Sequence, residues 1–377
     1  MKKILFVANV AKEHILKFHI PTIKHFKEEG WQVDVACAGD EEVPYCDHQF
    51  HTSWKRSPFT FKTFRGIREL KKILASEHYD IVYCHTPVGG LVARMAAKKA
   101  RKNGTKVIYF AHGLHFFKGA SPVNWLTFYP IEKYLAHKTD VFFALNNEDY
   151  DFVTKDFCKS LTVRQVPGVG ADFSRLDVED KAAVRAAYRR ELGIPEDAPV
   201  LIYVAELIKN KNQPMLIDAL RVVREKHPQA VLLLVGPEHD NGAVKAYVEK
   251  QGLQDAVKLL GWRSDIGKLM AASDIYVASS LREGFPINLL EAQYCGLPVV
   301  ATKNRGHVTP IVHGENGFLV DIGDHEAMAL YIDTLLTDPA VYEKLSSVDV
   351  SRYECHRIAK ELYDTVLETT GCKGREE

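Results

Sequence analysis

The chain lacks the cysteine pattern of a disulfide framework or of a zinc site. Its seven cysteines are scattered along 377 residues, and no two of them form a C-x-x-C pair. An odd, unpatterned set predicts reduced thiols and therefore a cytoplasmic protein. No apolar run approaches the roughly 20 residues that a helix needs to cross a bilayer. A G-x-G-x-x-G dinucleotide fingerprint is missing as well, so nicotinamide chemistry has little support.

The chain also lacks net charge, with 49 basic and 49 acidic residues, but these charges are unevenly distributed. Residues 1–165 contain 25 Lys and Arg against 17 Asp and Glu, whereas the remaining residues contain 24 against 32. Much of the basic excess lies in two stretches, 55–72 and 94–106, and phenylalanines are interleaved with the first. Such a surface can attract anionic lipid headgroups by about 1 kcal/mol per cation. A pair of solvated helix faces would explain the same pattern, and nucleic acid is disfavoured because no recognition module is visible.

Short β-branched runs alternate with longer helical patterns, which predicts an α/β protein with parallel sheets. The predicted helices include 184–192, 213–226 and 243–251. The predicted strands are 4–8, 33–37, 81–84, 106–110, 141–145, 163–166, 200–204, 230–235, 257–259, 275–278, 299–301 and 317–320. Each half of the chain has the size of one Rossmann-like domain. A turn-rich junction after the sixth strand divides the chain into predicted domains 1–167 and 168–350, followed by a last helical segment, 351–377.

Two carboxylates flank a Gly/Pro turn in the C-terminal third of the chain. Glu283 precedes Gly284, Phe285 and Pro286, and Glu291 follows just over one turn inside an apolar helix. The glycine lets the backbone come close to a ligand, and the proline suits the first helical turn. The free N–H groups and the positive end of the helix dipole form a seat for phosphate. One carboxylate can therefore meet each flank of a bound nucleotide-sugar, although two solvated glutamates in a strand–loop–helix unit would give the same pattern.

This Glu283…Glu291 block resembles the signature of family 4 glycosyltransferases, and the resemblance extends over nearly the whole chain. It implies the GT-B fold, in which two Rossmann-like domains with parallel sheets face each other across a cleft. Residues 1–167 would then form the acceptor-side domain and residues 168–350 the nucleotide-sugar-binding domain. The helix within 351–377 would cross back to the first domain. Enzymes of this family retain the anomeric configuration, usually without a dissociable metal, so no cofactor and no metal are expected.

The resemblance also implies which residues bind the nucleotide-sugar donor. Glu283 would contact the sugar hydroxyls, with Gly284, Phe285 and Pro286 shaping the pocket, and Glu291 would bind the ribose hydroxyls. The diphosphate would be held by the backbone N–H groups of Asn288 and Leu289 and by Lys211, which matches a family lysine. Where many members have an arginine before this lysine, the chain has Glu206, which puts a purely cationic phosphate clamp in doubt. The nucleotide base would lie near Trp262 and Arg263.

Histidines mark the predicted acceptor side. His112 and His115 follow the fourth predicted strand, in a segment that is similar to bacterial capsule and exopolysaccharide enzymes, and His112 matches a family position close to the transferring sugar. His14 and His19 follow the first strand, where the same enzymes have a His-rich loop. Capping or packing roles are equally compatible with His14 and His19. We therefore predict Glu283, His112 and Lys211 as catalytic residues, with His14, His19 and His115 on the acceptor side.

The resemblance implies a retaining glycosyltransferase that moves a sugar from a nucleotide-diphosphate sugar to a lipid-linked or glycan acceptor. UDP is the expected carrier, GDP-mannose is an alternative, and capsule or exopolysaccharide biosynthesis is the expected pathway. The expected location is the cytoplasm, with peripheral contact to an anionic membrane through the basic first domain and no nucleic-acid partner. Two rival hypotheses are a UDP-N-acetylglucosamine 2-epimerase-like enzyme, which can share the fold, and a non-catalytic partner subunit that has lost donor binding.

Overall fold

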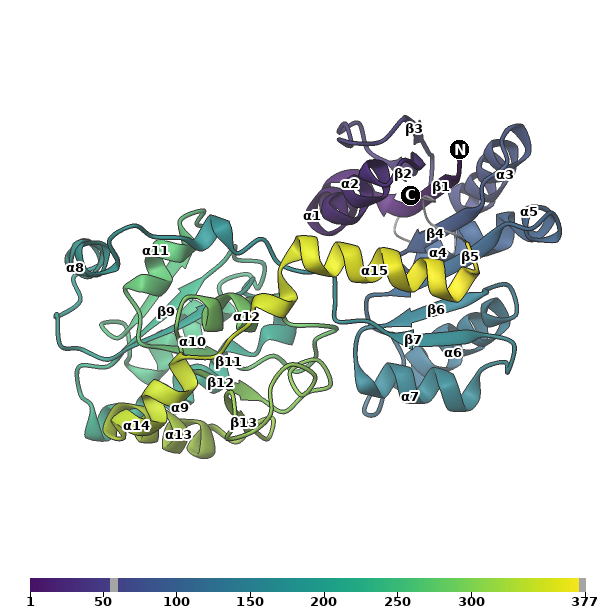
Figure 1. Cartoon of the computed structure of the whole chain (residues 1–377). Coiled ribbons are helices and arrows are strands. Elements are labelled where there is room, and N and C mark those ends of the chain that lie inside the picture. The colour runs from purple at the N-terminus through teal and green to yellow at the C-terminus, as the bar shows by residue number, and fades with distance from the viewer. Residues whose placement is uncertain (55–59, 373–377) are drawn as a thin grey trace. The chain divides into compact units, whose positions relative to one another are not determined.

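A computed structural model describes residues 1–54 and 60–372, which form two α/β units (Figure 1). Unit 1 comprises Met1–Gly170 together with the chain from Cys355 onward, and unit 2 comprises Ala171–Glu354. The predicted α/β class with Rossmann-like parallel sheets is confirmed. Lys55 and Arg56 of the first basic stretch lie outside the described residues. Within the described ranges, none of the helices combines the length and the apolar character that spanning a bilayer requires.

Unit 1 is built on a seven-stranded sheet in the order β3-β2-β1-β4-β5-β6-β7, and every neighbouring pair is parallel. The strands are β1 (Lys3–Val10), β2 (Gln32–Ala38), β3 (His48–His51), β4 (Ile81–His85), β5 (Lys106–Ala111), β6 (Val141–Ala144) and β7 (Thr162–Gln165). The central strands read as continuous apolar runs because helices cover both faces of a parallel sheet. The sequence did not predict β3, whose residues His-Gln-Phe-His offer no apolar run and which lies at the sheet edge.

Helices connect these strands, and the last helix of the chain also belongs to unit 1. Those of unit 1 are η1 (Ala11–Ile15), α1 (Leu16–Phe18), α2 (Ile20–Glu28), α3 (Phe61–Ser76), α4 (Pro87–Ala96), α5 (Lys98–Lys102), α6 (Pro122–Ala136), α7 (Asn147–Asp156) and α15 (Cys355–Thr370). Helix α15 packs on α2, where the ring of Tyr363 lies 4.9 Å from that of Phe26. The winding of the sheet reverses between β1 and β4, and sheets of this kind bind ligands beyond the carboxyl ends of their strands at such a point.

Unit 2 has a six-stranded parallel sheet in the order β10-β9-β8-β11-β12-β13. Its strands are β8 (Val200–Val204), β9 (Val231–Val235), β10 (Val257–Gly261), β11 (Ile275–Ala278), β12 (Val299–Thr302) and β13 (Phe318–Val320). Its helices are η2 (Ser174–Leu176), α8 (Lys181–Glu191), η3 (Lys209–Lys211), α9 (Gln213–Lys226), α10 (Ala243–Gln251), α11 (Ile266–Ala271), α12 (Ile287–Tyr294), α13 (His325–Thr337), α14 (Pro339–Ser346) and η4 (Ser351–Tyr353).

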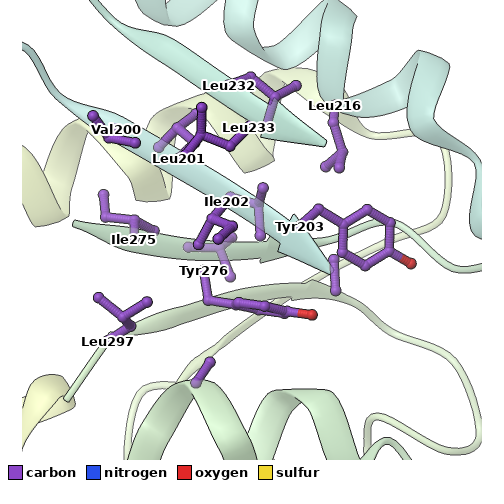
Figure 2. Packing of buried hydrophobic residues seen from close by; sticks show 14 of the residues in the cluster. Val200, Leu201, Ile202, Tyr203, Leu216, Leu232, Leu233, Ile275, Tyr276 and Leu297 are labelled. Carbon is purple, nitrogen blue, oxygen red and sulfur yellow. The ribbon is translucent and has the colours of Figure 1, made fainter. Parts of the chain in front are cut away.

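The core of unit 2 includes two buried tyrosines, Tyr203 near the carboxyl end of β8 and Tyr276 at the second position of β11 (Figure 2). Leu201 and Ile202 of β8 pack with Ile275 of β11 and with neighbouring leucines. The hydroxyl of Tyr203 lies 2.7 Å from Ser280 Oγ, and that of Tyr276 lies 3.3 Å from the Val204 nitrogen, which donates to it. The apolar packing therefore ends near the carboxyl end of β8, where the hydroxyl groups of the two tyrosines form hydrogen bonds.

Unit 1 contains a buried ion pair that ties two helices to the sheet. Arg94 of α4 has no exposed surface, and its guanidinium donates to both carboxylate oxygens of Glu132 on α6, at 2.7 and 3.0 Å. The same guanidinium lies 3.8 Å from the ring centre of Tyr109 on β5. Two charges at this depth are stable only together, because either one alone would remain desolvated without compensation.

We predict that Glu132→Ala lowers the free energy of unfolding of unit 1 by about 3–5 kcal/mol, because it leaves Arg94 buried without its counter-charge. Urea unfolding monitored by circular dichroism measures this change. The control is Lys155→Ala, which removes an exposed pair with Asp151 on α7 and should cost about 0.5 kcal/mol or less. Equal effects of the two variants would contradict the prediction.

Candidate functional site

An ion pair at the carboxyl ends of β8 and β11 joins two residues that were predicted separately. Lys211 closes η3 after β8, and Glu283 lies in the loop after β11. The Lys211 Nζ atom donates to Glu283 Oε1 at 2.6 Å, and the two side chains are 19% and 16% exposed. The pair is therefore mostly shielded from water but can still be reached by a ligand.

Backbone hydrogen bonds fix the two loops that carry this ion pair. Ser279 Oγ donates to the Lys211 carbonyl at 2.8 Å, and Asn210 Nδ2 donates to the Arg282 carbonyl at 2.9 Å. The Leu281 N–H donates in turn to the Asn210 carbonyl at 2.8 Å. The loop after β8 and the loop after β11 therefore hold each other, and the ammonium and carboxylate groups have little freedom to separate without a competing ligand.

A third loop, which follows β12, packs directly against Glu283. A Cβ atom added to Gly306 would lie only 2.5 Å from the Cβ of Glu283, so only glycine fits at this position. Next to it, His307 is buried, and its Nδ1 atom lies 2.7 Å from the Thr302 carbonyl oxygen. Burial lowers the pKa of His307 to about 4, although the nearby Glu283 carboxylate opposes this shift. The sequence analysis missed Gly306 and His307 because a Gly-His dipeptide in a loop carries no recognisable signal.

Helix α12 begins at Ile287, directly after the loop that carries Glu283 and one residue after the predicted first turn. Pro286 stands at the N-cap rather than in the first turn, and no side chain caps the helix. Asn288 Nδ2 donates to the Val204 carbonyl at 3.2 Å, and Leu289 is fully buried in the core. Phe285 packs against Tyr353 with 5.8 Å between the ring centres. The side chains of these predicted residues thus support the turn. The Leu289 N–H, which was predicted to bind the diphosphate, donates to the Pro286 carbonyl at 3.2 Å, so the N–H groups before it at the helix start are the part that can meet a ligand.

Glu291 faces an arginine that the sequence analysis did not identify. The carboxylate is 7% exposed and accepts a short hydrogen bond from Arg175 Nη2, which reaches it from η2. The Arg175 side chain is 47% exposed. Sequence reasoning had no means to find this pair, because 116 residues separate its members. A diol that binds Glu291 would meet the arginine at the same place.

The other predicted donor residues differ in exposure and partners. Trp262 is 73% exposed and follows β10, an edge strand that β9 separates from β8. Arg263 donates to both oxygens of Asp265, at 2.8 and 2.6 Å, and this contact lowers the pKa of Asp265 to about 2. Glu206 is exposed. Trp262 thus offers a free aromatic face for a base, whereas Arg263 is already held by a carboxylate.

In unit 1, four histidines meet where three neighbouring strands end. His14 lies in η1 after β1, His19 precedes α2, His85 ends β4 and His112 follows β5. Their ligand nitrogens all lie within 4.8 Å of one another, and His14 Nε2 is 3.1 Å from His19 Nε2. The sequence analysis predicted three of the four and missed His85, because it ends an apolar strand. His115 lies apart from this four-histidine cluster and stacks on Phe128 at 4.7 Å.

Burial keeps the four-histidine cluster neutral. Desolvation lowers the pKa of His14 to about 4. It also lowers the pKa values of His19, His85 and His112 well below the usual range, and the proximity of the other rings adds to the effect. At neutral pH each ring therefore offers one N–H donor and one lone pair.

Comparisons with known proteins agree with this geometry. A family model described as glycosyl transferases group 1 matches residues 184–348, and one described as glycosyl transferase 4-like matches residues 3–146. EpsD of Bacillus subtilis (strain 168), provisionally described as a glycosyltransferase, is 42% identical over 344 residues, or 91% of this chain and 90% of EpsD. An Escherichia coli relative, named UDP-Gal:alpha-D-GlcNAc-diphosphoundecaprenol alpha-1,3-galactosyltransferase, is 29% identical over 76% of this chain and 73% of its own length.

Solved structures show the same fold. Anabaena HepE in complex with UDP matches with a TM-score of 0.79 at 22% identity, over 98% of this chain and 100% of HepE. WaaG, a glycosyltransferase involved in lipopolysaccharide biosynthesis, matches with a TM-score of 0.70 at 17% identity, over 97% of this chain and 99% of its own. These likenesses confirm the predicted GT-B fold class.

The buried His307 predicts a pH-dependent stability of unit 2. Its pKa is about 4 in the folded protein and about 6.5 in the unfolded chain, so the unfolded chain binds the proton first as the pH falls. The stabilising effect of the neutral ring is complete above pH 6.5 and is lost between pH 6.5 and pH 4. Between pH 7 and pH 5, the free energy of unfolding should fall by about 2 kcal/mol more in the parent protein than in His307→Gln. Urea unfolding at several pH values measures this, and parallel profiles would contradict it.

Proposed function

Because this chain belongs to the group 1 glycosyltransferases, we propose that it transfers a sugar from a UDP-sugar to a lipid-linked or glycan acceptor, with retention of configuration. Exopolysaccharide or capsule biosynthesis is the proposed pathway, by the resemblance of the His112 segment to such enzymes, and the likeness to EpsD over almost the full length supports the glycosyltransferase activity. The named activity of the E. coli relative, which uses UDP-Gal and a diphosphoundecaprenol-linked sugar, supports a UDP-sugar donor and a lipid-linked acceptor. The UDP that is bound to HepE supports the same donor class.

The Lys211–Glu283 ion pair beside the uncapped start of α12 is the observation that carries this proposal. An ammonium and free N–H groups can stabilise the charge that develops on a departing diphosphate, and a neighbouring carboxylate can bind sugar hydroxyls. When the donor binds, its diphosphate replaces part of the contact between Lys211 and Glu283. The positive charge then comes from Lys211 and the helix dipole, so no metal ion is required at the diphosphate. Glu206 in place of a second cation leaves Lys211 as the cation at the matched family position.

The proposed reaction exchanges one bond at the anomeric carbon for another. The bond from that carbon to the β-phosphate oxygen breaks, and a bond to the acceptor hydroxyl oxygen forms on the same face of the sugar. The acceptor proton passes to the departing phosphate oxygen, so a side-chain base is not needed. By family resemblance, His112 lies close to the transferring sugar, and His14 and His19 lie on the acceptor side. A 2-epimerase or a non-catalytic subunit has no comparable support, because Lys211, Glu283 and Glu291 are all in place.

Nucleotide binding tests the donor assignment. We predict that UDP raises the melting temperature more than GDP, ADP or TDP does, with or without EDTA. A ligand at a hundredfold over its Kd adds about 2.7 kcal/mol of stability. Preference for GDP would keep the family and change the donor. No shift with any of the four would favour a subunit that has lost donor binding.

Two glutamate variants separate the proposed roles. Glu291→Gln should raise the Kd for UDP by about tenfold or more, because a charged hydrogen bond contributes about 1.5–3 kcal/mol. Glu283→Gln should reduce turnover much more than UDP affinity, because its partner is the sugar. Isothermal titration calorimetry and a transfer assay measure the two effects, with Glu249→Gln on the exposed face of α10 as the control. Unchanged UDP affinity in Glu291→Gln would place the ribose elsewhere.

We further propose that unit 1 docks on an anionic membrane. On α3, Phe61 and Phe64 are 94% and 67% exposed. A groove at the other end of α3 is lined mainly by lysines and small apolar residues of α3 and α5, among them Lys71, Lys98, Lys99 and Lys102. Exposed aromatics and a cationic groove on the same helix fit the boundary between lipid headgroups and acyl chains. A protein that acts on lipid-linked sugars would find its acceptor there.

Flotation with vesicles tests this docking. The protein should float with vesicles that contain anionic lipid but not with neutral ones, and high salt should release it. Lys98→Gln/Lys99→Gln should weaken binding by about thirtyfold, since each cation contributes about 1 kcal/mol. Phe61→Ser/Phe64→Ser should also weaken it. The matched control, Lys245→Gln/Lys250→Gln on α10, should float like the parent protein, and equal flotation of all variants would reject the proposed surface.

A further inference from the structure

The four-histidine cluster, His14, His19, His85 and His112, occupies the position where a doubly wound sheet binds ligands. Strands β1, β4 and β5 are neighbours in the sheet of unit 1, and the winding reverses between β1 and β4 (Figure 1). The histidines stand at the carboxyl ends of these strands or just beyond them. Three separate connections of the chain therefore bring imidazole rings to one point, which local sequence patterns alone would not produce.

The backbone around the cluster is unusual in two places. His14 lies in the π-helix η1, and His19 follows five residues later. The π-helix ends at Ile15, and the His19 N–H donates to the Ile15 carbonyl at 2.9 Å, so His19 lies one α-helical turn beyond it. Directly after His85, Thr86 has a φ angle of +64°, a conformation that a threonine rarely adopts. Strained backbone of this kind concentrates at functional sites.

Several ring nitrogens of the cluster have no hydrogen-bond partner among the residues that the structure describes. Both nitrogens of His85 and the Nε2 atom of His112 are buried in this way. His85 itself has no exposed surface. Buried polar atoms are rarely left without a partner in folded proteins, so a ligand at the centre of the cluster would give a partner to the Nε2 atom of His112 and to one nitrogen of His85.

We propose that His14, His19, His85 and His112 bind one divalent transition-metal ion, with Zn²⁺ as the first candidate. Imidazole nitrogen is a preferred ligand of Zn²⁺, Cu²⁺ and Ni²⁺. Tetrahedral Zn²⁺ with Zn–N bonds of about 2.0–2.1 Å needs ligand nitrogens about 3.3–3.4 Å apart. The His14–His19 separation of 3.1 Å and the 4.8 Å limit for the whole set bracket this value. Small ring rotations would complete the site.

The ligand chemistry narrows the choice of ion. The cluster contains no carboxylate, so Mg²⁺ and Ca²⁺, which prefer oxygen ligands, do not fit it. The proposed ion is held by residues of unit 1 alone, whereas the proposed diphosphate seat is built from residues of unit 2. The proposal departs from the sequence-based expectation of no metal site, which was made without His85.

Metal titration of the full chain, produced without a histidine tag, tests the proposal. After removal of metals with a chelator, the parent protein should bind one equivalent of Zn²⁺ per chain and gain melting temperature. His85→Gln should bind Zn²⁺ at least tenfold more weakly, whereas His115→Gln, the matched control in the same unit, should bind like the parent. Co²⁺ as a spectroscopic probe should give a tetrahedral spectrum without a thiolate charge-transfer band, which separates this site from the scattered cysteines.

Each result of the metal titration either supports or overturns the proposed site. One equivalent in the parent, its loss in His85→Gln and its persistence in His115→Gln would support the site. No stoichiometric binding in the parent, or equal binding in both variants, would overturn it and leave a set of hydrogen-bonded neutral imidazoles. If His85→Gln does not fold, His14→Gln provides the same test, because His14 lies on η1 rather than in the sheet. Nucleotide binding does not enter any of these readouts, so failure here leaves the proposed transferase activity untouched.

Discussion

In a parallel sheet that helices cover on both faces, polar side chains reach a ligand most readily at the ends of the strands. Both units of this protein are built around such a sheet, and their strands are mostly apolar, although unit 1 also buries Asp34 within β2 and the Arg94–Glu132 pair against the sheet. The polar side chains that can bind a ligand therefore lie where the strands end. In unit 2 these are Lys211, Glu283 and the loop before His307, and in unit 1 they are the four histidines. The proposed donor site and the proposed metal site follow from one constraint.

The two sites differ in how deeply their polar side chains are buried and in whether those side chains are charged. Lys211 and Glu283 form an ion pair at 2.6 Å, and both side chains remain partly exposed. The four histidines lie deeper, and burial removes their charge instead. A charged pair suits the recognition of a charged nucleotide. A neutral imidazole cluster suits a soft or borderline cation, or hydrogen bonds to a neutral hydroxyl.

The sequence predicted the features that depend on local patterns. The central strands and the turn between Glu283 and Glu291 were predicted in this way, because apolar runs and Gly/Pro turns are visible without tertiary context, whereas Lys211 was predicted from the family resemblance. Contacts between distant segments were not predictable. Arg175 reaches Glu291 across 116 residues, His85 looks like the last residue of an apolar strand, and β3 pairs through its backbone with no apolar signal. Gly306 matters only because the Glu283 loop packs against it.

The central claim is that unit 2 binds a UDP-sugar through Lys211, the start of α12 and Glu291. A crystal structure of the protein with UDP tests this most directly. The account predicts a phosphate oxygen within about 2.7–3.2 Å of Lys211 Nζ and of first-turn N–H groups, with the ribose hydroxyls donating to Glu291. UDP bound in another part of the chain, or a diphosphate that makes no contact with Lys211 and α12, would contradict it.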